Sequence, residues 1–238
     1  MFDLDGTLLR FSTEPFVKAY FGELKKVFAQ MELDGDGVMK AVLAGTMAMV
    51  KGGGNELNAD RFWASFAAAT KLPDETIRAI ENRCDSFYSN EFDRVKSVHE
   101  PSDIPGRLVR GLTAKGYGVV LATNPLFPPP AITTRLRWIG LTPDDFLLAT
   151  HYANSTYCKP NPGYYREIFA KISKSPEQCL MIGNNPVDDV SASKLGVQTY
   201  LLTDYLENET GVDITQYRRG SIEELEAYLT SLPDLGGR

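Results

Sequence analysis

The sequence has little cysteine, no long apolar run and no excess of positive charge, and each deficit excludes a class of protein. Cys84, Cys158 and Cys179 are odd in number and show no C-x-x-C spacing, so we expect a reduced, cytoplasmic protein without a disulfide scaffold or structural zinc. No apolar run approaches the length of a membrane span, and no segment has the pattern of a signal peptide. The 25 basic and 31 acidic residues give a net charge of −6, which argues against nucleic acid or a membrane surface as the main partner.

Two carboxylates stand near the amino end, in the segment Phe2-Asp3-Leu4-Asp5-Gly6-Thr7-Leu8. Side chains at i and i+2 of an extended segment point to the same face, so Asp3 and Asp5 would share one site. Charges this close need neutralisation, either by a proton held on one carboxyl or by a hard cation such as Mg²⁺. Gly6 and Thr7 allow a tight turn whose N–H groups and hydroxyl can face an anion. This segment is the first candidate for a reaction centre.

A calcium loop is the main alternative for such acidic segments, and its spacing fails here. An EF-hand loop that starts at Asp3 would need glycine where Leu8 stands, and Asp34-Gly35-Asp36-Gly37 has Gly45 in place of the final glutamate. We expect this second segment to be a solvated turn. Only two residues precede Asp3, so either the first strand is very short or the natural chain starts farther upstream.

Residues 14–95 show helical periodicity almost throughout. Apolar side chains recur every three or four residues from Val17 to Met31, and helical patterns also cover 38–50, 60–69 and the segment that follows Pro73. The flexible Gly52-Gly53-Gly54-Asn55 separates two of these helices. We predict a separate helical subdomain at residues 13–98, inserted into a core made of residues 1–12 and 99–238.

The core alternates between predicted strands and helices. We expect strands at 118–122, 146–150, 179–182 and 198–202, and helices at 106–115, 131–139, 163–171, 187–195 and 221–232. This alternation predicts an α/β fold, with a Rossmann-like parallel sheet wrapped by helices and the site at the carboxyl ends of the strands.

Polar residues do follow the predicted strands. Thr123 and Asn124 come directly after the strand at 118–122, and Gly183-Asn184-Asn185-Pro186-Val187-Asp188-Asp189 ends the strand at 179–182. Lys159 stands between them, in a stiff Lys-Pro-Asn-Pro loop before a helix. A lone lysine or threonine is weak evidence for a functional site. The segments at Asp3, Thr123, Lys159 and Gly183, taken together and in this order, are much stronger evidence.

These residues resemble the motifs of the haloacid dehalogenase (HAD) superfamily of aspartate-nucleophile phosphatases, over essentially the whole chain. Asp3 to Thr7 match D-x-D-G-T in full, and the helical block lies where members of this superfamily carry an α-helical, C1-type cap. The resemblance implies that Asp3 is the nucleophile and Asp5 the general acid and base, while Thr123 and Lys159 hold the phosphoryl oxygens.

The resemblance also implies a Mg²⁺ site, formed by Asp3, Asp5 and an acidic residue of the last motif. Asn184 stands where many members have aspartate, so either Asp188 or Asp189 completes the site, and Asn184 can bind through its carbonyl. Gly6, Thr7 and Asn124 are expected to contact the substrate, and Lys51, beside the glycine run, can meet a second anionic group.

The function that follows is that of a Mg²⁺-dependent phosphatase acting on a small phosphorylated metabolite through an aspartyl-phosphate, as a monomer or homodimer. Asp5 disfavours a dehalogenase, because a halide leaves without a proton. Two alternatives stay open: a phosphomutase, which uses the same residues, and a catalytically weak protein that binds phospho-ligands or regulates.

Overall fold

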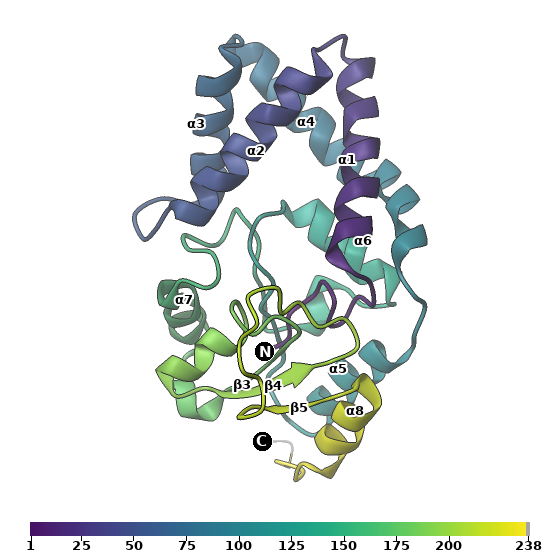
Figure 1. Cartoon of the computed structure of the whole chain (residues 1–238), viewed down its shortest axis with the longest axis vertical. Helices are drawn as coiled ribbons and strands as arrows, with labels where there is room; N and C mark the ends of the chain where they lie inside the picture. The colour runs from purple at the N-terminus through teal and green to yellow at the C-terminus, as the bar shows by residue number, and fades with distance from the viewer. Residues whose placement is uncertain (237–238) are drawn as a thin grey trace.

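Phe2 and five short strands form a parallel sheet in the computed structural model, which describes residues 1–236 (Figure 1). The strands are β1 (Val120–Leu121), β2 (Leu148–Ala149), β3 (Leu180–Gly183), β4 (Gln198–Leu202) and β5 (Arg218–Gly220). Phe2 bridges to Leu121 on one side and to Ile182 on the other, so the spatial order is β2-β1-Phe2-β3-β4-β5. The parallel sheet confirms the predicted α/β class.

Helices cover both faces of the sheet because neighbouring strand residues point in opposite directions. Val120 and Met181 pack into an apolar cluster with α7 (Pro162–Ile172). Leu121 and Ile182, the next residue in each strand, belong to a second cluster that includes residues of α5 (Ile104–Ala114), α6 (Pro129–Trp138) and α8 (Ile222–Ser231). A sheet buried on both faces explains why its strands read as continuous apolar runs.

Four helices form a group of their own at one end of the molecule, which we call the four-helix unit (Figure 1). They are α1 (Thr13–Gln30), α2 (Gly35–Lys51), α3 (Asn58–Thr70) and α4 (Asp74–Asn90), and the 3-10 helix η1 (Glu91–Val98) leads from them to the core. The Gly52-Gly53-Gly54-Asn55 segment lies between α2 and α3, as expected. The division into a core and an inserted subdomain stays a prediction of the sequence.

The solvated turn predicted at Asp34-Gly35-Asp36-Gly37 is wrong. Asp34 caps α2 by accepting a hydrogen bond from the backbone N–H of Asp36, and residues 35–37 form the first turn of the helix. Aspartate is a strong N-cap residue, and this role outweighs the low helix propensity of the two glycines.

Most other differences between the predicted and the observed secondary structure concern where helices and strands begin and end. Strands β1 and β2 cover two residues each and are shorter at both ends than the runs predicted at 118–122 and 146–150. Residues 190–195 form the 3-10 helix η4 (Val190–Leu195) in place of the predicted helix at 187–195, and β5 was not predicted. Two further 3-10 turns, η2 (Pro143–Asp145) and η3 (Pro176–Gln178), begin at prolines.

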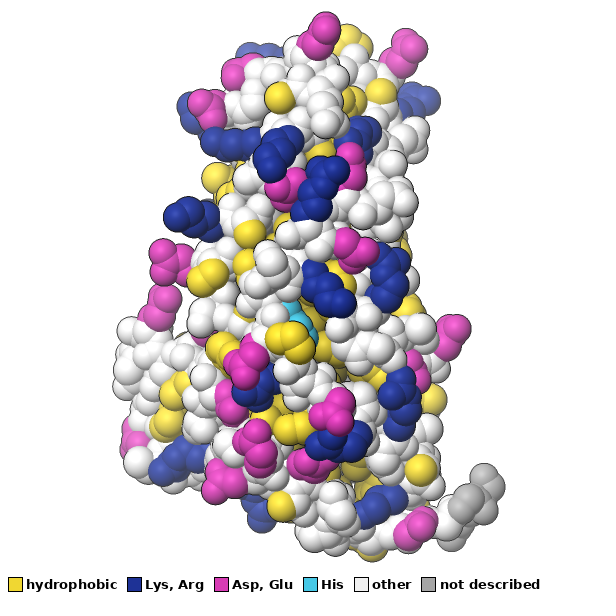
Figure 2. Space-filling model, turned by 90° about the vertical axis from the view of Figure 1, so that its right-hand side faces the viewer, with side chains coloured by type: hydrophobic (Ala, Val, Ile, Leu, Met, Phe, Trp, Pro, Cys, Tyr) yellow, Lys and Arg dark blue, Asp and Glu magenta, His cyan; other side chains and the backbone are white. Residues whose placement is uncertain are grey.

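The surface shows no strong separation of charge on the face drawn in Figure 2, where basic and acidic side chains alternate. Within residues 1–236, no helix combines the length and the apolar character needed to cross a membrane. Cys84, Cys158 and Cys179 are all free thiols.

Candidate active site

Lys159 joins two strand ends through a pair of buried ion pairs. Its Nζ lies 2.8 Å from Oδ1 of Asp3, which follows Phe2 in the middle of the sheet, and 2.6 Å from Oδ1 of Asp189, which follows β3. The three side chains are almost fully buried. The backbone holds Asp3 in place, because its N–H donates to the carbonyl of Ile182. The sequence motifs of residues 3, 159 and 189 therefore meet at one point.

The charges at this point do not balance. Burial alone would lower the pKa of the Lys159 ammonium, but Asp189 and Asp3 outweigh it and hold that pKa well above its usual value. Burial raises the pKa of Asp3 to about 8, although Lys159 lowers it in part. One lysine thus faces two buried carboxylates, and a further cation near Asp3 would stabilise its ionised form.

Asn184 supports the turn that follows Asp5. Its Oδ1 accepts a hydrogen bond from the hydroxyl of Thr7 at 3.3 Å, and its Nδ2 donates to the carbonyl of Tyr205 at 2.7 Å. Gly6 has φ +74°, and a Cβ at that position would lie 2.2 Å from Nδ2 of Asn184. Glycine is therefore required at residue 6 for both backbone conformation and space.

Thr123 and Asn124 lie beside the lysine, at the end of β1. Thr123 is buried, and its carbonyl oxygen accepts hydrogen bonds from the hydroxyls of Thr150 and Tyr164. Oδ1 of Asn124 accepts a hydrogen bond from the backbone N–H of Lys159 at 3.3 Å. The predicted residues of the second and third motifs are thus neighbours.

Asp5 has a partner that the sequence analysis missed. Nη1 of Arg135, on α6, lies 2.9 Å and 2.7 Å from the two carboxylate oxygens of Asp5. The Arg135 side chain is 0% exposed, its guanidinium lies 4.2 Å from the centre of the Phe127 ring, and its Nη2 is buried without a hydrogen-bond partner within residues 1–236. This arginine fixes the orientation of Asp5.

A signal for Arg135 was present in the sequence. It falls on the apolar stripe formed by Ala131, Ile132, Leu136 and Ile139, at the spacing that marks the buried face of a helix. A charged residue in such a stripe is rarely buried without a partner, so its position indicates a carboxylate nearby.

The oxygen donors around Asp3 suit a hard cation, but they do not form a complete metal cage. Asp189 is engaged by Lys159 and by the N–H of Asn185, and both oxygens of Asp5 face Arg135. Burial raises the pKa of the half-buried Asp188, whose carboxylate forms no ion pair within the described residues. No group of three or more acidic, histidine or cysteine side chains in residues 1–236 has the geometry of a metal site. Carboxylate and amide oxygens of Asp3, Asp188 and Asn184 are nevertheless the ligand type that Mg²⁺ prefers.

The glycine segment of the four-helix unit meets the loop that carries Lys159, but not through Lys51. Lys51 is exposed and has no ion pair or side-chain hydrogen bond among residues 1–236. A Cβ added at Gly53 would lie 2.8 Å from the Tyr157 ring, and one at Gly163 would lie 2.7 Å from it. The segment therefore packs against Tyr157, two residues before Lys159.

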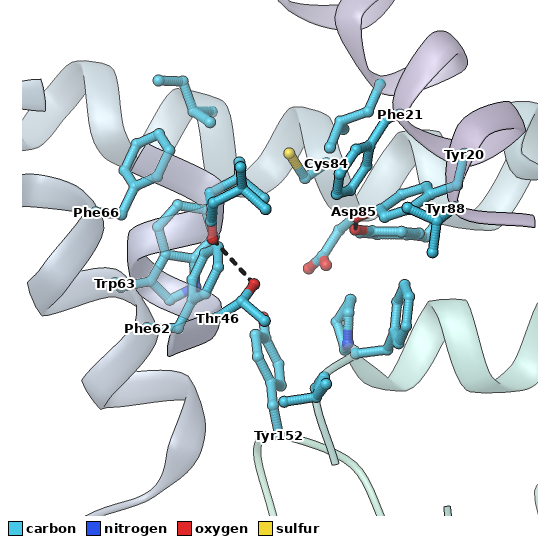
Figure 3. Close-up of a pocket in the computed structure, with 18 of the residues that line it drawn as sticks. Tyr20, Phe21, Thr46, Phe62, Trp63, Phe66, Cys84, Asp85, Tyr88 and Tyr152 are labelled. Atoms are coloured by element: carbon cyan, nitrogen blue, oxygen red, sulfur yellow. Dashed lines mark hydrogen bonds between the residues drawn. The ribbon is translucent and has the colours of Figure 1, made fainter. Parts of the chain in front are cut away.

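An apolar cavity of about 260 Å³ lies between the helices of the four-helix unit and reaches the core at Asp5. Aromatic side chains from three helices line it, among them Tyr20, Trp63 and Tyr88 (Figure 3). Phe127 and Tyr152 close it from the core side. The site thus combines a charged sheet edge with an apolar chamber above it.

Comparison with known proteins gives one family. A family model described as a haloacid dehalogenase-like hydrolase matches residues 1–196. No match to the chain was found among curated proteins.

Solved structures with the same fold include phosphatases and a dehalogenase. A HAD phosphatase from Thermococcus onnurineus has 15% sequence identity and a TM-score of 0.59, with 98% of each chain covered. A predicted phosphoglycolate phosphatase from Haemophilus somnus 129PT has 16% identity and a TM-score of 0.57, with 95% of each chain covered. An L-2-haloacid dehalogenase from Xanthobacter autotrophicus has 13% identity and a TM-score of 0.54, with 97% of each chain covered. Likeness at this identity establishes the fold, and both chemistries occur on it.

Proposed function

The chain belongs to the haloacid dehalogenase-like hydrolase family, and on that premise we propose that it is a Mg²⁺-dependent phosphatase of small phosphorylated metabolites. The observation that carries the proposal is the buried contact of Lys159 with both Asp3 and Asp189. The second carboxylate of the first motif, Asp5, stands two residues after Asp3. A nucleophile beside a fixed cation, with an acid two residues away, suits transfer of an anionic phosphoryl group.

The reaction follows in two steps. A carboxylate oxygen of Asp3 attacks phosphorus, the bond from phosphorus to the ester oxygen breaks, and Asp5 gives the departing alkoxide a proton. Water then attacks the acyl phosphate, Asp5 takes its proton, and free phosphate leaves with Asp3 restored. Lys159 stabilises the charge on the phosphoryl oxygens, and Thr123, Asn124 and the N–H groups of Gly6 and Thr7 orient them.

Magnesium would be held by the oxygens of Asp3, Asp188 and Asn184, and would supply the positive charge that this edge of the sheet lacks. The raised pKa of Asp3 supports this part of the proposal, since the nucleophile must be ionised to attack. The four-helix unit acts as the cap, because its cavity opens directly onto Asp5.

Release of phosphate from p-nitrophenyl phosphate tests the proposal. We expect a rate that requires Mg²⁺, that EDTA abolishes, and that falls by at least about 10³-fold in Asp3→Asn, because the substituted amide cannot act as a nucleophile. Asp74→Asn, an exposed aspartate at the start of α4, is the matched control and should keep the wild-type rate. An Asp3→Asn enzyme of normal activity would refute the mechanism.

A phospho-ligand-binding protein with little catalysis is the second candidate, and the Asp5–Arg135 pair favours it. Arg135 occupies both oxygens of the carboxylate that must exchange a proton. This candidate predicts that phosphate raises the melting temperature, through binding to the native state, without turnover of any ester. Release of chloride from 2-chloropropionate would identify a dehalogenase instead.

A further inference from the structure

We propose that the cavity in the four-helix unit binds the leaving group of the substrate, and that this group is an apolar alcohol bearing an ammonium ion whose counter-charge is Asp85. The inference rests on the proposed phosphatase function and adds the chemical class of the substrate.

The position of the cavity assigns it to the leaving group. Asp5, the proposed acid that protonates the departing oxygen, lines its core end, and the helices α1 to α4 line the rest. An apolar cavity of roughly 150 Å³ already accepts benzene, and this one measures about 260 Å³. A short alkyl chain ending in a bulky head group fits within that volume.

The walls are aromatic where the head group would lie. The cavity is lined from three helices and the core by Tyr20 and Phe21 of α1, Trp63 of α3, Tyr88 of α4 and Tyr152 (Figure 3). The face of an aromatic ring attracts a cation, and several rings around one chamber are the usual way in which proteins recognise a quaternary ammonium.

The charge in the cavity has one sign. The described lining residues include two ionisable carboxylates, Asp5 and Asp85, and no lysine, arginine or histidine. Asp5 is neutralised by Arg135, which lies behind the Phe127 ring and outside the lining. Asp85 has no such partner: its carboxylate makes neither a hydrogen bond nor an ion pair within residues 1–236, and it points into the cavity (Figure 3).

The surroundings of Asp85 favour a cation over an anion. Asp85 lies at the solvent-exposed side of the cavity, its partial burial raises the pKa of its carboxyl, and Glu81, one turn earlier on α4, adds a second negative charge nearby. An ammonium in the cavity would lower that pKa and meet both the aromatic faces and the carboxylate. A second phosphate or a carboxylate on the substrate would instead meet the unpaired negative charge of Asp85 and would be disfavoured.

Three esters separate these cases. Phosphocholine carries the proposed cation, 3,3-dimethylbutyl phosphate has the same shape without charge, and phosphoglycolate carries an anion. We expect kcat/KM for phosphocholine to exceed that for its uncharged analogue by about tenfold, equivalent to about 1.4 kcal/mol, and phosphoglycolate to be the poorest of the three.

Asp85→Asn tests the counter-charge, because it keeps the size of the side chain and removes its charge. The ratio of kcat/KM between phosphocholine and the uncharged analogue should fall close to one in this variant. Asp74→Asn, at the exposed start of the same helix, should leave the ratio as in the wild type. Circular dichroism of both variants checks that the helices are intact.

Binding provides a readout that needs no turnover. Calorimetric titration of the wild-type protein with choline should give tighter binding than titration with 3,3-dimethylbutan-1-ol, and Asp85→Asn should remove the difference. Equal binding of the two alcohols would overturn the inference. So would turnover of p-nitrophenyl phosphate together with equal rates on the two matched esters, although the phosphatase proposal would then stand. If no ester is hydrolysed, the phosphatase proposal fails, and the titration alone decides whether the cavity recognises an ammonium.

Discussion

The sheet edge and the cavity above it are adjacent, yet they are built in opposite ways. At the sheet edge Asp3, Lys159 and Asp189 hold one another at hydrogen-bond distance in a buried, charged group. In the cavity the side chains are mostly aromatic, and Asp85 has no fixed partner. Charged pairs set geometry, whereas apolar walls set shape and volume. We therefore expect the sheet edge to control kcat and the cavity to control KM and selectivity.

Removing the central cation should have the largest effect. Lys159→Met leaves Asp3 and Asp189 facing each other without a positive charge, so we expect kcat to fall by roughly a hundredfold or more and the free energy of unfolding to fall by about 3–5 kcal/mol. Steady-state kinetics and urea unfolding measure the two effects.

A second variant and a control keep this prediction interpretable. Lys159→Met/Asp189→Asn removes one of the stranded charges and should regain part of the stability without regaining activity. Lys171→Met disrupts an ion pair with Glu167 on the surface of α7 and should change neither. A normal kcat in Lys159→Met would show that the sheet edge does not act through this lysine.

Arg135 tests whether the sheet edge extends into α6. Arg135→Met frees Asp5 to adopt other rotamers, so we expect kcat to fall by about tenfold while KM changes little. Arg137→Met, two residues later on the exposed side of the same helix, is the matched control. A change in KM alone would show that Arg135 acts on the cavity and not on the sheet edge. Arg135→Lys keeps the positive charge, so it should restore part of kcat.

The two regions also differ in how far the sequence reveals them. Asp3, Lys159 and Asp189 each stand at the end of a strand or in a stiff loop, and parallel topology brings such ends together. Their meeting was predictable, although the sequence left open whether Asp188 or Asp189 serves a metal. The structure pairs Asp189 with Lys159. Arg135 was missed because it lies inside a helix, α6, and not at a strand end, so the parallel topology does not say what its side chain meets.

The cavity was not predictable for a related reason. Tyr20, Trp63 and Tyr88 lie on three helices, and the periodicity of each helix gives its buried face but not what that face meets. The sequence alone therefore gives no reason to place these three residues around a cavity and not in an ordinary apolar core. Lys51, chosen as a substrate contact because it stands beside the glycines, is exposed. Sequence patterns therefore predict functional residues at the ends of strands more reliably than they predict cavities between helices.

A cavity substitution should change substrate binding more than catalysis. Trp63→Leu enlarges the chamber and removes one aromatic wall, so KM for p-nitrophenyl phosphate should rise by about fivefold while kcat stays within about twofold. Methyl phosphate is the matched control substrate, since its leaving group is too small to reach the wall, and its KM should not change. A fall in kcat for both substrates would contradict the division of roles.

The smallest expected effect concerns the hydroxyl pair of Tyr20 and Tyr88, which are hydrogen-bonded in the buried part of the four-helix unit. Tyr20→Phe leaves the Tyr88 hydroxyl without its partner and should lower the free energy of unfolding by about 1–2 kcal/mol. Tyr20→Phe/Tyr88→Phe removes both polar groups and should lie closer to the wild type. Thermal and urea unfolding measure this, and a double variant less stable than the single one would contradict it.

The contact at Tyr157 has a consequence for engineering. Glycines from two distant segments, Gly53 and Gly163, leave the space that this ring occupies. A transplant of the four-helix unit onto another core would lose the fit unless the acceptor carried an equivalent aromatic residue and a glycine in its following helix. Gly53, Tyr157 and Gly163 therefore form a joint that should be exchanged as a set, and chimaeras that respect it are the ones in which substrate preference can move between proteins.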